Sequence, residues 1–226
     1  MADTYEVEVK SLLGDQEKAD LLKQKLFERD PECVLHKTSN QLNHYFEGGD
    51  VGNLVTVFAE KLSEETLEKL ARIRDEGSNV SVRSREANGE VRFVVKASVG
   101  DDSSANGVAR IEIEESLPGV TLQELDALIQ EAGYTYQAKW SRAREEYKTG
   151  QFSVCLDKNA GYGYLAEFER VVEDEALLAE ARKDIDLLMA ELGVEELPQD
   201  RLERMFSHYN QHWPKYYGTD TIFIIE

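Results

Sequence analysis

The feature that most constrains this fold is the alternation of charged and apolar residues in short segments. It appears first near the N-terminus, in the run Glu6-Val7-Glu8-Val9-Lys10. Residues two apart in a β-strand lie on the same face, so the two glutamates and the lysine share one face and the valines share the other. The valines predict a packed core on their side. The charged face then has two choices, which are solvent or the interior of a barrel.

The same alternation returns in later segments, where charged residues share one face and both signs of charge occur across the set. These are Arg83 and Arg85; Lys96 among Val94, Val95 and Ala97; Arg110, Glu112 and Glu114; Arg142 and Arg144; and Glu167 and Glu169, with Asp157 on the strand before. One charged strand face is most often a solvated sheet surface. Repetition on at least five strands favours a common interior, because buried charges must be paired or must hold a ligand or metal.

Eight segments have the composition of strands, namely 5–12, 33–46, 79–85, 91–98, 108–116, 134–147, 151–157 and 162–172. Helical spacing predicts helices over 15–27, 63–75, 121–132, 174–192 and 198–212. Residues 54–60 are predicted to be a further short β-rich stretch, 100–107 a loop, and 221–226 a last extended segment. The predicted fold is α+β, an eight-stranded antiparallel β-barrel with flanking helices. A barrel of about eight strands has room for one small ligand.

Charge and cysteine content narrow the classes of partner. Lys plus Arg is 26 and Asp plus Glu is 45, so the net charge is 26 − 45 = −19. Such a surface repels duplex nucleic acid and anionic membranes. Two distant cysteines, Cys33 and Cys155, favour a reducing cytoplasm. No apolar run has the roughly 18 residues of a membrane span. We therefore expect a cytoplasmic protein that binds a small molecule, and a homodimer is left open.

The ordered set of motifs resembles the CYTH superfamily, the triphosphate tunnel metalloenzymes. The N-terminal run matches the ExExK motif of that family, and later segments follow in the family's order. These are residues 41–46 (QLNHYF), 82–85 (VRSR) with Lys96, 110–114 (RIEIE), 142–147 (RAREEY), and Asp157 with Gly163 and 167–169 (EFE). ExExK alone matches many sequences by chance, whereas the ordered set over about residues 5–192 is fairly specific.

The resemblance implies a tunnel of eight antiparallel strands and a role for each charged group. It implies Glu6, Glu8, Asp157, Glu167 and Glu169 as ligands of Mg²⁺ or Mn²⁺, which prefer carboxylate oxygens. It implies Lys10, Arg83, Arg85, Lys96, Arg142 and Arg144 as triphosphate contacts, and Arg110 joins this basic set. Glu6, Glu8 and Lys10 are the expected catalytic residues. Glu112 and Glu114 could be metal ligands or partners for arginines, and Lys139 competes with Arg142 and Arg144 for the basic positions.

The chain departs from the compact members of the family in two places. We expect one tunnel domain over residues 1–193, with a helical insertion near 50–77. Residues 194–226 are expected to form a helical extension packed on that domain, which resembles the extension of thiamine triphosphatases.

Three functions are compatible with these residues. The first is a metal-dependent hydrolase of inorganic tripolyphosphate, thiamine triphosphate or a nucleoside triphosphate. The second is a class IV adenylyl cyclase, in which the ribose hydroxyl of ATP attacks the α-phosphate and pyrophosphate leaves. The third is a non-catalytic module that binds polyphosphate, which the motif glutamates argue against because anion binding alone does not require them.

Overall fold

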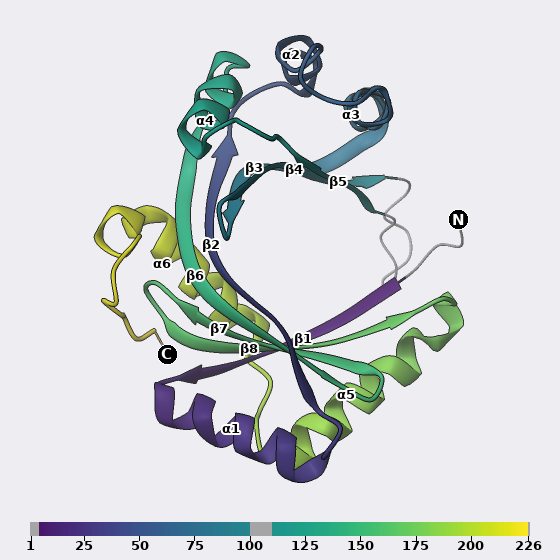
Figure 1. Ribbon diagram of the computed structural model, residues 1–226, viewed down its shortest axis with the longest axis vertical. Coiled ribbons are helices and arrows are strands. Elements are labelled where there is room, and N and C mark those ends of the chain that lie inside the picture. Colours follow the sequence, from purple (N-terminus) through teal and green to yellow (C-terminus); the bar gives the residue numbers. More distant parts are fainter. Residues whose placement is uncertain (1–4, 100–109, 226) are drawn as a thin grey trace. The chain divides into compact units, whose positions relative to one another are not determined.

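The computed structural model describes residues 5–99 and 110–225, and Figure 1 shows the arrangement of the elements. The strands are β1 (Tyr5–Gly14), β2 (Val34–Glu47), β3 (Gly77–Ala87), β4 (Glu90–Val99), β5 (Arg110–Ser116), β6 (Thr135–Thr149), β7 (Phe152–Asn159) and β8 (Gly163–Val172). The helices are α1 (Gln16–Arg29), α2 (Val51–Val57), α3 (Glu64–Glu76), α4 (Leu122–Glu131), α5 (Leu178–Leu192) and α6 (Gln199–His212).

The eight strands form one sheet, in the order β1-β8-β7-β6-β2-β3-β4-β5. The registers described between neighbouring strands are all antiparallel. This confirms the predicted α+β class and the eight antiparallel strands. Closure of the sheet into a tunnel stays a prediction. The chain divides into two compact units, one holding residues up to Asn40 and from Ser141 onward, the other Gln41–Trp140. We call them the terminal unit and the central unit.

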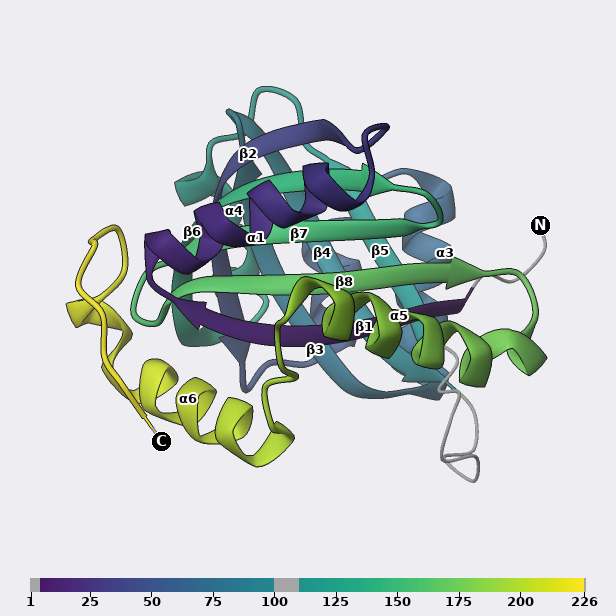
Figure 2. The same ribbon diagram turned by 90° about the horizontal axis from the view of Figure 1, so that it is seen from below.

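In the terminal unit, α1 and α5 cover one face of the strands β7, β8 and β1 (Figure 2). Helix α1 begins where Asp15 accepts a hydrogen bond from the backbone amide of Lys18 (2.9 Å), which satisfies one of the free N–H groups of the first turn. Alternate strand residues pack against the two helices, among them Val9, Val154 and Phe168. The residues between them in each strand therefore point to the opposite face, as the alternation predicts.

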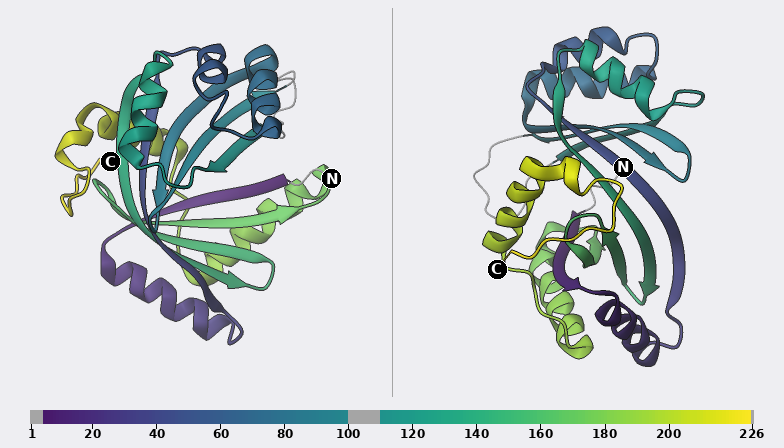
Figure 3. Two further views of the ribbon diagram at one scale, coloured as in Figure 1. Left: turned by 45° about the horizontal axis from the view of Figure 1, so that its top comes forward. Right: turned by 90° about the vertical axis from the view of Figure 1, so that its left-hand side faces the viewer.

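In the central unit, α2, α3 and α4 lie on one side of β3, β4 and β5 (Figure 3). Helix α4 begins with a capping box, in which the side chains of Thr121 and Glu124 each bond the other's backbone amide. The core includes the stacked rings of Phe58 and Phe93, 4.4 Å apart. Strands β3 and β4 join at Asn88-Gly89, where both φ angles are positive (53° and 84°), as the predicted tight hairpin requires.

Two details differ from the sequence prediction. Residues 54–60 were expected to be extended, but α2 occupies Val51–Val57. Its N-cap is Asp50, which accepts a hydrogen bond from the amide of Gly52 (2.8 Å), and Leu54 and Phe58 are fully buried one helical turn apart. That burial outweighs the β-propensity of the valines. The helix expected from residue 174 begins as a 3₁₀ turn (Glu175–Leu177) that continues into α5.

The C-terminal segment belongs to the terminal unit. Helix α6 confirms the helix predicted over 198–212, and its Tyr209 is fully buried. The chain then returns to form a parallel bridge between Ile222 and Gly161. The loop predicted over 100–107 lies outside the described residues, as do the first two residues of the strand predicted over 108–116. Within the described residues, no helix is long and apolar enough to span a membrane.

Candidate functional site

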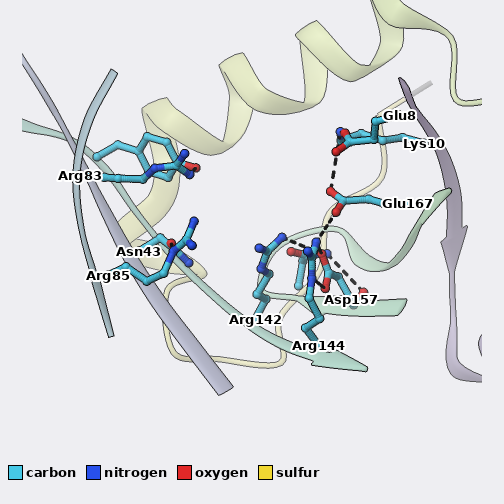
Figure 4. A network of polar contacts seen from close by, with 11 residues as sticks. Glu8, Lys10, Asn43, Arg83, Arg85, Arg142, Arg144, Asp157 and Glu167 are labelled. Atoms are coloured by element: carbon cyan, nitrogen blue, oxygen red, sulfur yellow. Dashed lines mark hydrogen bonds and ion pairs between the residues drawn. The ribbon is translucent and has the colours of Figure 1, made fainter. Parts of the chain in front are cut away.

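The charged face of the terminal unit gathers the ExExK residues with the carboxylates of β8. In the register of β1 and β8, Lys10 lies opposite Glu167 and Glu8 lies opposite Glu169. The ammonium of Lys10 forms an ion pair with Glu8 and lies 3.7 Å from the carboxylate of Glu167 (Figure 4). The structure thus brings Glu8, Lys10, Glu167 and Glu169 together on one sheet face.

A buried carboxylate, Asp157, anchors the two arginines of β6. Its side chain is fully buried, and it accepts hydrogen bonds from Arg142 (2.7 Å) and from two nitrogens of Arg144 (2.7 and 2.6 Å). Arg144 lies directly opposite Asp157 in the register of β6 and β7 and also bonds Glu167 (Figure 4). A buried charge is tolerated when it is paired and hydrogen-bonded, and this network meets that condition.

The network sets the protonation of its members. Burial alone would lower the pKa of Arg144, but the hydrogen bonds that it donates to Asp157 and the charge of Glu167 outweigh it and raise the pKa. Burial would raise the pKa of Glu167, but Arg144 and Lys10 outweigh it and lower the pKa. Both groups are therefore charged near neutral pH. The face presents fixed positive charges beside ionised carboxylates.

Glu169 has a different environment. Burial, followed by the negative charges of Glu6 and Glu167, raises the pKa of Glu169 to about 7. Donor atoms of Glu6, Glu8 and Glu169 all lie within 4.8 Å of one another. A trio of carboxylate oxygens suits a hard divalent cation such as Mg²⁺ or Mn²⁺. Burial and the charge of Glu6 both disfavour the ionised form of Glu169, and a bound cation would offset both effects. The residues therefore fit the metal that the motif implies.

On β7, Cys155 lies opposite Glu167 of β8. A second group of possible metal donors, Cys155, Glu167 and Glu169, has atoms within 4.8 Å of one another. Burial and the surrounding carboxylates raise the pKa of the Cys155 thiol to about 12, although Arg144 acts in the other direction. A thiol that stays protonated at neutral pH is a poor nucleophile. Cys155 is therefore a small residue in the wall of the site.

In the central unit, Arg83 and Arg85 each bond a residue of β2. Arg85 donates to Asn43 (2.9 Å), and Arg83 donates to the hydroxyl of Tyr45 (2.9 Å), with its guanidinium carbon 5.2 Å from the centre of that ring. The Nε atom of Arg83 is buried without a hydrogen-bond partner among the described residues. An unsatisfied guanidinium N–H is costly to bury, and an anionic ligand would satisfy it.

The remaining predicted residues of this unit form ion pairs of their own. Lys96 pairs with Glu112 (2.8 Å), and Glu114 pairs with Arg85 (3.1 Å) and with Arg92 (2.8 Å). The structure therefore gives Glu112 and Glu114 basic partners, and their role as metal ligands stays a prediction. Arg110 lies opposite Ser98 in the register of β4 and β5, and its side chain is outside the described part of the structure.

Lys139 and the two arginines have different surroundings. Arg142 and Arg144 bond Asp157, whereas the ammonium of Lys139 lies 4.0 Å from the centre of the Tyr136 ring and 3.9 Å from Asp126 on α4. The assignment of Arg142 and Arg144 to the basic positions stays a prediction.

Sequence reasoning missed several residues of these networks, namely Asn43, Tyr45, Arg92 and Asp126. Asn43 and Tyr45 alternate along β2 just as the arginines alternate along β3, and that spacing was available in the sequence. Asp126 was also detectable, because it interrupts an apolar helical stripe made by Leu122, Leu125 and Ile129.

Comparison with known proteins supports the motif assignment. The family model of the CYTH domain matches residues 4–201, whereas no curated protein matches this chain significantly. Solved structures share the fold at low identity. PH1012 of Pyrococcus horikoshii is 17% identical, with TM-score 0.57, over 84% of this chain and 92% of its own.

Two further solved structures are similar over most of their length. One, from Vibrio parahaemolyticus, is provisionally described as an adenylate cyclase; it is 16% identical with TM-score 0.58, over 90% of this chain and 98% of its own. HpAC1 from Hippeastrum is described as having a dominant triphosphatase activity; it is 16% identical with TM-score 0.51, over 90% and 96%. These likenesses concern the fold, and the match of the family model identifies the family. The chain belongs to the CYTH domain family.

Proposed function

We propose that this protein is a divalent-metal-dependent hydrolase of a triphosphate, which would be inorganic tripolyphosphate, thiamine triphosphate or a nucleoside triphosphate. The observation that carries the proposal is the pairing of two kinds of group on one sheet face. The carboxylates of Glu6, Glu8 and Glu169 lie beside the cationic side chains of Lys10 and Arg144. A triphosphate bound with a divalent cation needs both kinds of group.

Glu6, Glu8 and Glu169 would hold the cation, with Glu167 next to them and Asp157, Glu112 and Glu114 as further candidates. When bound, Mg²⁺ or Mn²⁺ supplies charge neutralisation at the phosphate oxygens and Lewis acidity. Glu8 forms an ion pair with Lys10. With a cation bound to Glu8, the ammonium of Lys10 would be able to bond a phosphate oxygen.

Arg142 and Arg144 are assigned to the phosphate chain, and Asp157 holds them in place. Each guanidinium bonds Asp157 through part of its donor set, and guanidinium groups carry five N–H donors in a fixed fork. The remaining donors can bond phosphate oxygens while the arginine stays anchored. The proposal extends the same role to Arg83, Arg85, Lys96 and Arg110 of the central unit, on the basis of residue type and the place of each in the family motifs.

We favour hydrolysis over cyclisation as the function. Hydrolysis needs only water as the acceptor of the phosphoryl group, whereas a cyclase must also position a ribose hydroxyl against the α-phosphate. The description of HpAC1 as chiefly a triphosphatase agrees with this order. Both cysteines are free thiols, which agrees with the proposed cytoplasmic location.

The test is product analysis over a substrate panel of tripolyphosphate, thiamine triphosphate and ATP, each with Mg²⁺ and with Mn²⁺. Release of orthophosphate supports the proposal and identifies the substrate. Cyclic AMP and pyrophosphate from ATP would instead establish a cyclase. Metal-dependent binding of tripolyphosphate without turnover of any substrate would establish a binding module.

A variant pair makes the assay specific to the site. Glu8→Gln keeps the size of the side chain but removes a carboxylate, so it should abolish metal-dependent turnover. Glu17→Gln, an exposed change on α1, is the matched control and should retain activity. Full activity in Glu8→Gln would rule out the proposed role of that residue.

A further inference from the structure

Asp126 is a buried carboxylate that the proposed reaction does not use. It lies on α4 with 3% of its surface exposed, in the middle of the helix's apolar stripe. Its Oδ1 accepts a hydrogen bond from the hydroxyl of Ser84 (2.5 Å), and its Oδ2 accepts from the hydroxyl of Tyr136 (2.7 Å) and lies 2.7 Å from Nδ1 of His44. Placing an unpaired charge in such a core is costly, so the three partners account for its presence.

The partners lie directly behind the arginine pair. His44 and Ser84 are opposite each other in the register of β2 and β3. The cross-strand pairs on either side are Asn43 with Arg85 and Tyr45 with Arg83. Successive strand residues face opposite ways, so the middle pair points to α4 and the outer pairs point to the opposite face of β2 and β3. The outer pairs are also bonded through their side chains.

We propose that Asp126 is a positioning residue for Arg83 and Arg85, holding the cross-strand pair between them from the helix side. The inference rests on the proposed function, because it takes the two arginines as phosphate contacts. The carboxylate of Asp126 contacts both strands at the His44–Ser84 pair. Arg83 and Arg85 are the residues on either side of Ser84 in β3. A shift of β2 against β3 would break the bonds to Asp126 and would move Asn43 and Tyr45 away from the arginines together.

The charge state of Asp126 is consistent with this role. Burial would raise the pKa of Asp126, but the hydrogen bonds from His44, Ser84 and Tyr136 outweigh it and lower the pKa below its ordinary value. An ionised carboxylate only accepts hydrogen bonds, so all three partners must donate to it, and Nδ1 of His44 carries the hydrogen. Asparagine at this position removes the negative charge and turns an NH₂ group toward at least one partner, which would then have to accept a hydrogen bond instead of donating one.

The variant Asp126→Asn is therefore the main test, with Ile129→Ala as its control. Ile129 is fully buried one turn later on α4, so its truncation also weakens the core but removes none of the three hydrogen bonds to Asp126. The first readout is the Nε–H signal of Arg85 in a ¹⁵N NMR spectrum, which Arg85→Lys identifies. Nε of Arg85 donates to Asn43, so its signal reports the geometry of the pair without requiring any activity.

The second readout is calorimetric binding of tripolyphosphate with Mg²⁺. We expect Asp126→Asn to move or broaden the Arg85 signal and to weaken binding roughly tenfold, as losses of outer-sphere partners do at metal sites. Ile129→Ala should leave both readouts as in the wild type. An unchanged Arg85 signal in Asp126→Asn, or the same change in Ile129→Ala, would overturn the inference.

Ser84→Ala provides a milder variant if Asp126→Asn does not fold. It removes only the bond to Oδ1 and keeps the carboxylate, and the same two readouts should change in the same direction by a smaller amount. Wild-type protein that binds none of tripolyphosphate, thiamine triphosphate and ATP would refute the proposed function instead. The Arg85 signal would still decide whether Asp126 positions the pair, so the two failures are distinguishable.

Discussion

Glu8 and Glu169 lie directly opposite each other on β1 and β8, so two carboxylates occupy neighbouring positions on one sheet face. Like charges placed opposite one another destabilise a sheet. Glu6 adds a third carboxylate whose donors lie within 4.8 Å of the other two. The arrangement is unfavourable for the ligand-free protein and favourable for binding a cation. The three carboxylates therefore lower the stability of the fold while they provide a site for a cation.

Glu169→Gln should stabilise the metal-free protein above pH 7. Folding raises the pKa of Glu169 to about 7 from its ordinary value of 4.5. The wild type therefore loses stability as pH rises through this interval, because the folded protein must give up a proton that it holds more tightly than the unfolded chain. Glutamine removes this loss. After allowance for solvent screening at a partly exposed group, we expect a gain of about 1 kcal/mol at pH 8.

The measurement is urea unfolding in the presence of a chelator at pH 5 and pH 8. The gain should be largest at pH 8 and should shrink toward pH 5, where Glu169 of the wild type is itself protonated in the folded state. A variant that is less stable than the wild type at pH 8 would contradict the repulsion assigned to the trio.

Asp157→Asn should destabilise the fold strongly. The carboxylate is fully buried and bonds Arg142 and Arg144, and removing one partner of a buried charge network leaves the others uncompensated. We expect a loss of about 3 kcal/mol in the free energy of unfolding. Urea unfolding measures it, with Glu17→Gln as the exposed control. A loss below that of a typical surface substitution would show that Asp157 does not anchor the arginines.

The sequence predicted the features of the site that depend on neighbouring residues in one strand. The alternation in β1 separated Val9, which packs against the helices, from Lys10, which joins the charged network. The hydrogen bonds that Arg142 and Arg144 donate to Asp157 could not be predicted in this way, because they depend on the register of β6 and β7. Register is fixed by packing over the whole sheet rather than by the residues that it brings together.

Two misses have a different cause. The segment of α2 is rich in β-branched residues, and its helix is set by the burial of Leu54 and Phe58, which local propensity does not report. Asp126 lies on a helix and not on a charged strand face, although its place in an apolar helical stripe is visible in the sequence. Its partners His44 and Ser84 are not visible in this way, since they meet only through the pairing of β2 with β3.

Gly161→Ala should destabilise the packing of α6 and the C-terminal chain. Gly161 has φ +91°, and a Cβ atom there would lie 2.7 Å from the ring of Tyr209 and 3.0 Å from that of Phe223. We expect a loss of roughly 2–3 kcal/mol from backbone strain and overpacking combined. Gly150→Ala is the matched control, because its φ is +55° and nothing lies near its Cβ position. It should cost only about 1 kcal/mol.

Urea unfolding compares these two glycine variants, and limited proteolysis reports on the C-terminal segment. Gly161→Ala should be cleaved faster after α6 than the wild type. Equal stability of the two variants would show that the close contact with Tyr209 relaxes without cost.

Mg²⁺ or Mn²⁺ should raise the midpoint of thermal unfolding, and Glu8→Gln should remove most of this effect. A ligand that binds only the folded state stabilises it by RT ln(1 + [L]/Kd), which is about 2.7 kcal/mol when the free cation is at 100 times its Kd. Glu8 contributes one of the three carboxylates whose donors converge, so the variant has a weaker site.

Glu112→Gln is the informative comparison, because Glu112 is paired with Lys96 in the central unit. If Glu112 is only an ion-pair partner, its variant keeps the stabilisation by the cation, and if it is a ligand, the variant loses it. Equal stabilisation of the wild type and Glu8→Gln would place the cation elsewhere and remove the main support for the proposed site.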